Sequence, residues 1–128
     1  MYFLVLLLIL AIDFATKYII RLYGGFYICN QGISWGLLLP KPLFWTFWLI
    51  SAIIILTLFF RSEKRAKISL IIILGGSMAN VLERVWHGCV SDFLTFPIIS
   101  FPSFNMADIT ITLGALMFLY YTFTPKRS

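Results

Sequence analysis

The chain has 128 residues, of which 61% are hydrophobic and only 12% are charged, and its formal net charge is +5. In soluble domains about a quarter of all residues are charged. A domain this small also buries too little surface to hide so many apolar side chains from water. The composition therefore excludes a water-soluble fold. The positive charge does not indicate nucleic-acid binding either, because most basic residues flank apolar stretches, where they set membrane topology and bind anionic lipids.

Four apolar stretches each approach the ~20 residues that a helix needs to cross ~30 Å of hydrocarbon. They cover residues 2–22, 42–60, 68–86 and 106–123. We expect a single membrane domain over residues 1–128, with all four stretches as spanning helices. The first stretch lacks a basic amino-terminal region and is interrupted by two charges, so we expect it to remain a span and not to be a cleaved signal peptide.

The two charges in the first stretch are Asp13 and Lys17, which lie four residues apart and so share one helix face. A charge inside the bilayer is costly, so such residues usually pair or have a function. We expect a structural ion pair, with direct catalytic contact as the alternative. The second stretch is almost wholly apolar, which predicts a packing role only.

The third stretch carries small and polar residues at helical spacing. Gly75 with Ala79, and Gly76 with Asn80, keep the side chains small at four-residue steps, which lets another helix approach closely. Glu83 continues this stripe. We therefore expect the stripe to face the interior of the helix bundle.

Six of the ten Lys and Arg residues lie between residues 61 and 67 or at the C-terminus. The excess of basic residues on the cytoplasmic side predicts that both termini and this loop are cytoplasmic. Segments 23–41 and 87–105 then lie outside. Within the second of these, residues 93–104 contain two prolines but are largely apolar, which favours a position in the membrane interface. Composition leaves open whether this segment is a flap over a site or a passive anchor.

Cys29 and Cys89 are the only cysteines, and they lack the paired spacing of a metal site. We interpret them as small apolar filler, with a disulfide as the alternative. The remaining acidic residues of interest are Asp92, after the third stretch, and Asp108, at the start of the fourth. Topology brings both to the outer interface. A carboxylate pair can serve as the acid and base of an aspartic protease, but a cation site or a structural hydrogen-bonded pair fits the same pattern.

Four sequence blocks occur in order along the chain: DFATK at 13–17, NQGISWG at 30–36, GGSMAN at 75–80 continuing to ERVWHGCVSDF at 83–93, and FNMAD at 104–108. Together these blocks resemble those of the lipoprotein signal peptidases (signal peptidase II). The resemblance implies an all-α integral membrane protein with four transmembrane helices and short extracytoplasmic loops. The family's extracytoplasmic sheet-like platform should be reduced, because the chain between Lys17 and Asn30 is shorter than in the family.

The resemblance also implies an activity: an aspartic endopeptidase that cuts diacylglyceryl-modified bacterial prolipoproteins just before the lipid-modified cysteine. Asp92 and Asp108 match the catalytic aspartates. The positions that match substrate-binding or supporting residues are Asp13, Lys17, Asn30, Gly32, Asn80, Arg84, Asn105 and Ala107. No metal or cofactor is implied. The expected partners are the prolipoprotein, membrane lipids and the cyclic peptide inhibitor globomycin, and we expect a monomer in the bacterial inner membrane with its active site at the extracytoplasmic interface.

Glu83 departs from the family, which usually carries Asp at this position. We expect Glu83 to be structural, holding Arg84 and the outer end of the third helix, with Arg84 or a nearby backbone donor as its partner. A role as a third catalytic acid is the alternative. Two other functions compete with proteolysis. A non-catalytic relative that binds lipidated peptides would have no need of a carboxylate pair, and a small transporter would carry charges on both sides of the bilayer midplane, whereas here they cluster outward.

Overall fold

The computed structural model describes residues 1–33 and 37–124. In chain order its elements are α1 (Tyr2–Leu22), β1 (Ile28–Asn30), α2 (Lys41–Arg61), α3 (Lys64–His87), β2 (Val90–Asp92) and α4 (Met106–Phe123). Within these described residues, four helices are long and apolar enough to cross a membrane. The predicted helical membrane fold is confirmed, and three of the four predicted spans agree with the helices to within one residue.

The third helix begins earlier than predicted, at Lys64 in place of residue 68. The four residues before the apolar stretch are lysine, arginine and alanine, which all favour helix, so α3 begins within the basic segment. At the other end of α3, Gly88 has φ of 74°, a left-handed conformation that glycine adopts without steric cost. Gly88 thus ends α3 and turns the chain directly into β2.

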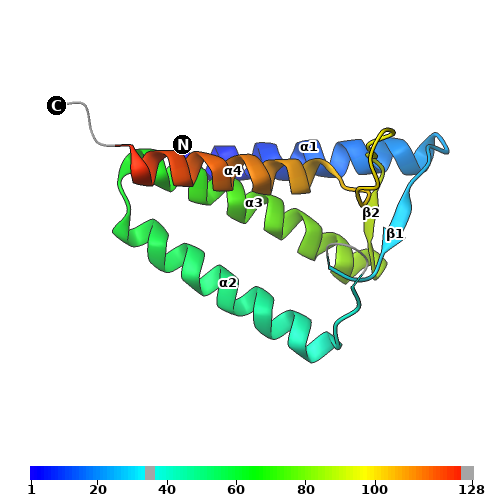
Figure 1. Ribbon diagram of the computed structural model, residues 1–128, viewed down its shortest axis with the longest axis horizontal. Helices are drawn as coiled ribbons and strands as arrows, with labels where there is room; N and C mark the ends of the chain where they lie inside the picture. The colour runs from blue at the N-terminus through cyan, green and yellow to red at the C-terminus, as the bar shows by residue number, and fades with distance from the viewer. Residues whose placement is uncertain (34–36, 125–128) are drawn as a thin grey trace.

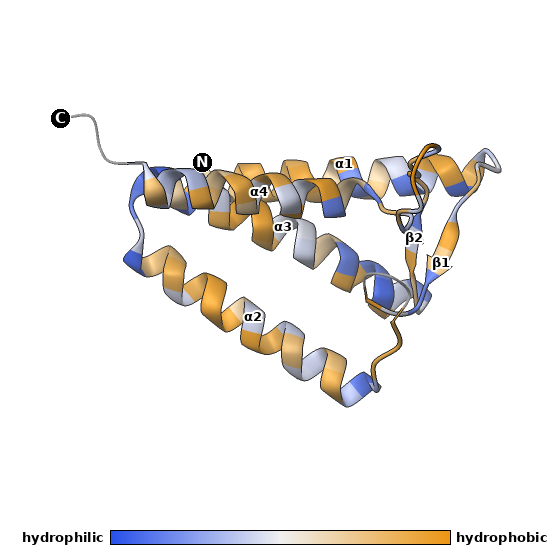
Figure 2. Cartoon of the chain, viewed as in Figure 1, coloured by the Kyte–Doolittle hydropathy of each residue, from blue (hydrophilic) through white to orange (hydrophobic). Residues whose placement is uncertain are grey.

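The helices form two unequal parts (Figure 1). α1, α3 and α4 pack side by side, whereas α2 diverges from α3 towards the end that carries the strands. Eight residues of α3 are buried, but α2, all of whose residues are described, has none. Figure 2 shows hydrophilic residues at the strand end of α3 and at the α2–α3 turn, with mostly apolar helix between them. α3 is therefore the core of the bundle, and α2 has its apolar surface left for lipid.

Glycines set the close approach of α4 to α3, as the sequence predicted. A Cβ on Gly76 would lie 2.7 Å from the carbonyl oxygen of Ala107, and a Cβ on Gly114 would lie 2.8 Å from Cγ1 of Ile73. Neither position has room for a side chain. Because Gly76 lies one turn before Asn80, this contact brings the first turn of α4 against the polar end of α3.

The sheet at the strand end is small. β1 and β2 are antiparallel strands of three residues each, with Ile28 opposite Asp92 and Asn30 opposite Val90. This is the reduced platform that the short first outer segment predicted. Both strands lie at the end of the bundle where α1 ends and α4 begins, opposite the α2–α3 turn (Figure 1).

Cys29 and Cys89 form a disulfide, with their Cα atoms 5.4 Å apart. The interpretation of the cysteines as apolar filler was therefore wrong. The strand register explains the pairing, because it sets Cys29 opposite Ser91 and so beside the corner where α3 turns into β2. The distance falls in the range that a disulfide requires.

The apolar segment 93–104 folds back on itself after β2. Leu94 and Phe104 exchange two backbone hydrogen bonds of 2.9 Å, and the rings of Phe96, Phe101 and Phe104 pack together. At its tip Ile98 is 93% exposed. The segment is an aromatic-cored loop whose bare apolar tip suits the membrane interface.

Candidate active site

Asp92 and Asp108 are held by different elements. Asp92 ends β2, and Asp108 lies in the first turn of α4. Asn105 caps α4 in a reciprocal arrangement: its side chain accepts from the Asp108 backbone N–H at 3.1 Å, while its own N–H donates to Asp108 Oδ2 at 3.0 Å. This capping box fixes the start of α4 and the Asp108 carboxylate together.

Three asparagines join the two carboxylates into one hydrogen-bond network, which we call the amide network. Asn30 donates to Asp92 Oδ2 at 3.0 Å and Asn105 donates to Asp92 Oδ1 at 2.8 Å. Asn80 donates to Asp108 Oδ1 at 2.9 Å and accepts from Asn105 at 3.2 Å. Every carboxylate oxygen of the pair therefore accepts a hydrogen bond from a neutral amide. The structure brings together the two aspartates that the sequence singled out.

A second set, which we call the ionic cluster, consists of Asp13, Lys17, Arg21 and Glu83. Lys17 Nζ lies 2.6 Å from Asp13 Oδ2 and 2.8 Å from Glu83 Oε2, so the predicted Asp13–Lys17 ion pair is confirmed. The other Asp13 oxygen accepts from the Ala107 N–H at 3.0 Å. Two carboxylates and two cations balance within a region where Asp13, Lys17 and Glu83 are almost completely buried.

Lys17 also connects the two sets. Besides its two ion pairs, Lys17 Nζ donates to Asn80 Oδ1 at 3.0 Å. Asn80 in turn bonds Asp108 and Asn105. The charge of Lys17 is thus one hydrogen bond away from the amides that hold the aspartates.

Glu83 has one of its two predicted partners, a backbone donor, but not the other, Arg84. It contacts Lys17, Arg21 and the Ser91 backbone N–H, which donates to Oε1 at 3.1 Å. Arg84 turns away and donates to the carbonyl of Gly32. Arg84 as the partner of Glu83 was wrong, because successive helix residues point about 100° apart and do not face each other. A nearby backbone donor as the partner is confirmed by the Ser91 N–H.

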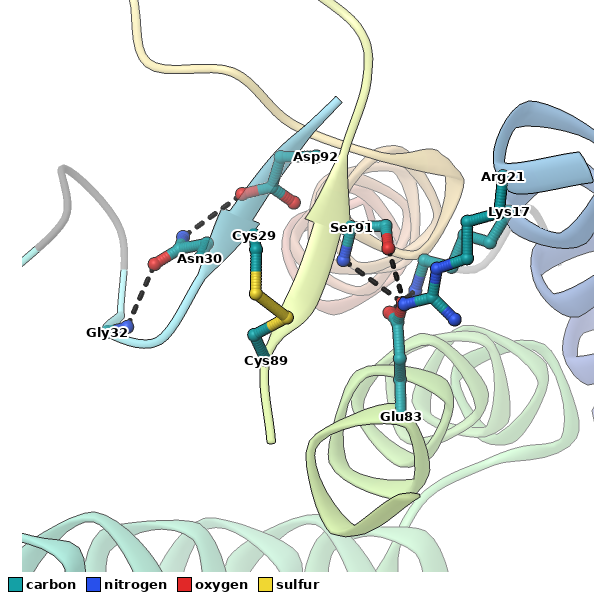
Figure 3. The surroundings of a disulfide bond; sticks show 9 residues. All are labelled: Lys17, Arg21, Cys29, Asn30, Gly32, Glu83, Cys89, Ser91 and Asp92. Atoms are coloured by element: carbon teal, nitrogen blue, oxygen red, sulfur yellow. Dashed lines mark hydrogen bonds and ion pairs between the residues drawn. A yellow bond between two sulfur atoms is a disulfide. The ribbon is translucent and has the colours of Figure 1, made fainter. Parts of the chain in front are cut away.

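Sequence reasoning missed Arg21 and Ser91. Arg21 donates both to Glu83 and to the hydroxyl of Ser91. Figure 3 shows Asn30 and Asp92 on one side of β2, and Ser91 with Glu83 and Arg21 on the other. Arg21 lies four residues after Lys17 and eight after Asp13, on the same helix face. That spacing was the signal that could have identified Arg21.

Arg84 and Gly32 shape the other wall of the site. Arg84 lies over the ring of Phe44 at the start of α2, 5.0 Å from its centroid. The Gly32 N–H donates to Asn30 Oδ1 at 2.9 Å, so that Asn30 is held from both ends of its amide. All the site residues named from the sequence therefore lie within or beside the two sets.

A cavity of about 650 Å³ opens beside Asp92 and Asp108. Its polar lining is Asn30, Asn80, Arg84, Asp92, Ser103, Asp108 and Thr112. Most of its wall is apolar and comes from α2, α4 and the 93–104 loop, with Phe44, Phe96, Phe101, Phe104, Ile111 and Leu113 among the residues. The volume falls in the range of sites for small molecules and short peptides. The carboxylate pair thus lies at the polar end of a mostly apolar cavity.

Burial raises the pKa of the Asp92 carboxyl above its ordinary value. The nearby negative charge of Asp108 acts in the same direction, while hydrogen bonds from Asn30 and Asn105 and the charge of Lys17 oppose it. A buried carboxyl beside a second carboxylate holds its proton more firmly. The surroundings of Asp92 therefore favour its protonated form.

Fold and site together define a small membrane protein of four spanning helices with a paired-carboxylate centre at one end. The family model described as Signal peptidase (SPase) II matches residues 5–124. The chain belongs to the signal peptidase II family, which confirms the resemblance of its motifs and places it among the peptidases.

Several relatives agree along almost the full chain. The lipoprotein signal peptidase of Brevibacillus brevis is 32% identical over 95% of this chain and 94% of the relative. That of Francisella tularensis subsp. novicida is 34% identical over 99% of this chain and 94% of the relative. A bacterial membrane enzyme solved by the in meso method at 2.3 Å has the same fold, with a TM-score of 0.83 and 25% identity over 99% of this chain and 92% of that one.

Proposed function

We propose that the chain is an aspartic endopeptidase that removes signal peptides from diacylglyceryl-modified prolipoproteins, with Asp92 and Asp108 as its catalytic pair. The observation that carries this proposal is the amide network, which links both carboxylates at the wall of one cavity. The relatives named lipoprotein signal peptidase support the substrate class. The cut falls just before the lipid-modified cysteine.

The chemistry requires one ionised and one protonated carboxyl. Asp92, with its raised pKa, holds the proton and transfers it to the scissile carbonyl oxygen as the water attacks. Asp108 lies in the first turn of α4, where the helix dipole favours a negative charge, and it takes a proton from the attacking water. After the tetrahedral intermediate forms, the proton on Asp108 passes to the leaving amine, and Asp92 recovers its own proton from the collapsing intermediate.

The cavity separates the two parts of the substrate. Its apolar wall from α2 and α4, including Phe44, Ile111 and Leu113, takes the acyl chains of the diacylglyceryl group. Asn30 and Arg84 lie at the polar end and bind the peptide backbone, because an amide and a guanidinium supply the donors that peptide carbonyls need. The inhibitor globomycin, a cyclic peptide, is expected to occupy the same polar end.

We also propose that the 93–104 loop is a mobile flap over the site. It lies between the two aspartates in the chain, and Phe96 and Phe101 line the cavity, while Ile98 points its apolar side chain outward. A spin label at Ile98 should report a depth at the lipid interface and lose mobility when globomycin binds. Unchanged mobility would make the loop an anchor only.

The site faces the outside of the inner membrane in this proposal, with both termini in the cytoplasm. Two observations support it. The basic residues cluster at the α2–α3 turn, at the end opposite the strands, and the Cys29–Cys89 disulfide lies at the strand end, as expected on the oxidising side. A reporter fused at Ser128 that reads out as extracytoplasmic would contradict this orientation.

The decisive test incubates the purified protein in lipid with a diacylglyceryl prolipoprotein, with and without globomycin. We expect cleavage before the lipidated cysteine and inhibition by globomycin. The unmodified prolipoprotein is the matched control substrate, and it should be cut far more slowly. Binding of the lipidated substrate without any cleavage would leave the protein as a non-catalytic member of its family.

A further inference from the structure

Arg21 connects three elements of the fold at one point. It lies at the end of α1, and its guanidinium donates both to the Glu83 carboxylate of α3 and to the Ser91 hydroxyl of β2. Glu83 and Ser91 are buried, whereas the Arg21 side chain is 24% exposed. Arg21 thus reaches inward from the edge of the bundle to two buried groups.

These contacts complete the open edge of β2. β1 pairs with one edge of the strand. On the other edge, no strand among residues 1–33 and 37–124 lies beside β2, and the Ser91 N–H donates to Glu83 Oε1 at 3.1 Å. Glu83 therefore takes the place of a strand partner. An isolated two-stranded sheet is only marginally stable, so a strand of three residues needs this second support to stay in one position.

Arg21 is placed to act through β2 and not on the substrate. It does not line the cavity at the carboxylate pair, and it borders a separate recess together with Tyr18, Leu22 and His87. Ser91 and Asp92 are neighbours on a strand, so their side chains point to opposite faces. A shift at Ser91 moves Asp92 with it.

We infer that Arg21 is a positioning residue: by holding Glu83 and Ser91 it fixes β2 so that the Asp92 carboxylate stays aligned with Asp108. This inference rests on the proposed function. Charge balance alone does not require an arginine here, since a lysine carries the same charge. The geometry does, because the guanidinium nitrogen that reaches both Glu83 and Ser91 lies one atom further from the backbone than a lysine nitrogen would.

The test compares Arg21→Lys with Arg61→Lys, a matched change at the far end of α2. Each variant is measured for kcat, KM, globomycin affinity and thermal midpoint. For Arg21→Lys we expect kcat to fall about tenfold, since a misplacement of ~1 Å at a reacting group costs up to about a hundredfold. KM, globomycin affinity and midpoint should stay near those of the unaltered protein. Arg61→Lys should change none of them.

A second variant separates positioning from general stability. Ser91→Ala removes one of the two Arg21 contacts and keeps the Ser91 N–H bond to Glu83. It should lower kcat less than Arg21→Lys, and the double variant should be no slower than Arg21→Lys alone, because both changes remove the same contact. A kcat for Arg21→Lys that equals the unaltered value, or that falls only with the folded fraction, overturns the inference.

Asp92→Asn, measured beside these variants, distinguishes a failure of the proposed function from a failure of the positioning role of Arg21. If it keeps normal turnover, the proposed function fails. If it is inactive while Arg21→Lys is fully active, only the positioning role fails. Amide hydrogen exchange at Ser91 gives a readout that needs no activity. The exchange should be faster in Arg21→Lys than in the unaltered protein, and equal rates would also contradict the inference.

Discussion

Buried polar groups on the two faces of β2 are stabilised by different kinds of partner. On the Asp92 face, neutral amides of Asn30 and Asn105 bond the carboxylate, and the site opens to a cavity. On the Ser91 face, full charges of both signs cancel in the ionic cluster. The strand between them is only three residues long.

The difference follows from what each face must do. An amide stabilises a carboxylate without fixing its protonation state as firmly as a cation would, so a carboxyl among amides can still exchange its proton. Ion pairs hold side chains of opposite charge against one another, which suits a support. The comparison therefore predicts that substitutions on the Asp92 face alter catalysis, and that substitutions on the ionic face alter stability or alignment.

The largest effect should come from the carboxylates themselves. Asp92→Asn and Asp108→Asn should each lower kcat by about a thousandfold or more, because either change removes a proton donor or acceptor from a pair that acts as a unit. The folded yield should remain close to normal, since an amide can occupy the same space. Near-normal turnover in either purified variant would refute the catalytic assignment.

On the ionic face, Lys17→Met should destabilise the protein by roughly 3–5 kcal/mol, the usual effect of leaving a buried charge without its partner. Here Asp13 and Glu83 both lose a contact to Nζ. The measurement is the thermal midpoint in detergent. Lys41→Met, at the exposed start of α2, is the control, and an equal midpoint for the two variants would show that the cluster contributes little.

A smaller effect is expected on the Asp92 face, where a change at Asn30 should alter the pH dependence of kcat. The proposed mechanism needs Asp92 protonated, so activity falls as pH rises through the pKa of Asp92. The hydrogen bond from Asn30 lowers that pKa, so Asn30→Ala should raise it and move the alkaline limb of the kcat profile to higher pH. Gln31→Ala, at an exposed neighbour, should leave the limb in place. A shift to lower pH would contradict the mechanism.

The smallest effect should follow removal of the disulfide. In water, closing a loop of 60 residues stabilises a fold by about 4 kcal/mol. Membrane helices confine the unfolded chain and reduce this gain. We expect the Cys29→Ser/Cys89→Ser double variant to fold and to lose activity only a few fold, through looser placement of Asn30. Inactivity of the double variant would show that β1 depends on the bond far more than its hydrogen bonds suggest.

Helices were easier to predict from this sequence than the contacts at their ends. The apolar stretches indicate which segments span the membrane. Helix periodicity puts Asp13 and Lys17 on one helix face, and Gly76 and Asn80 on another. Such local rules require no knowledge of the rest of the fold. The family motifs supplied Asp92 and Asp108, which the residue pattern alone left open between several functions.

The errors concerned long-range pairing. The Cys29–Cys89 bond depends on the register of two strands of three residues, which carry too little periodicity to be recognised in a sequence. Glu83 was assigned to its neighbour Arg84, although i and i+1 residues on a helix diverge. Its charged partners, Lys17 and Arg21, come from another helix. Local spacing put Arg21 on the right face of α1, but only tertiary packing defines what that face meets.

The disulfide has a further consequence for how the chain enters the membrane. It closes a covalent ring that contains the whole α2–α3 hairpin, since Cys29 precedes α2 and Cys89 follows α3. In the proposed orientation the second cysteine reaches the oxidising side only after α3 has crossed the bilayer. Oxidation then comes after insertion of the hairpin, and the bonded form, which migrates differently on a non-reducing gel, marks chains in which that step is complete.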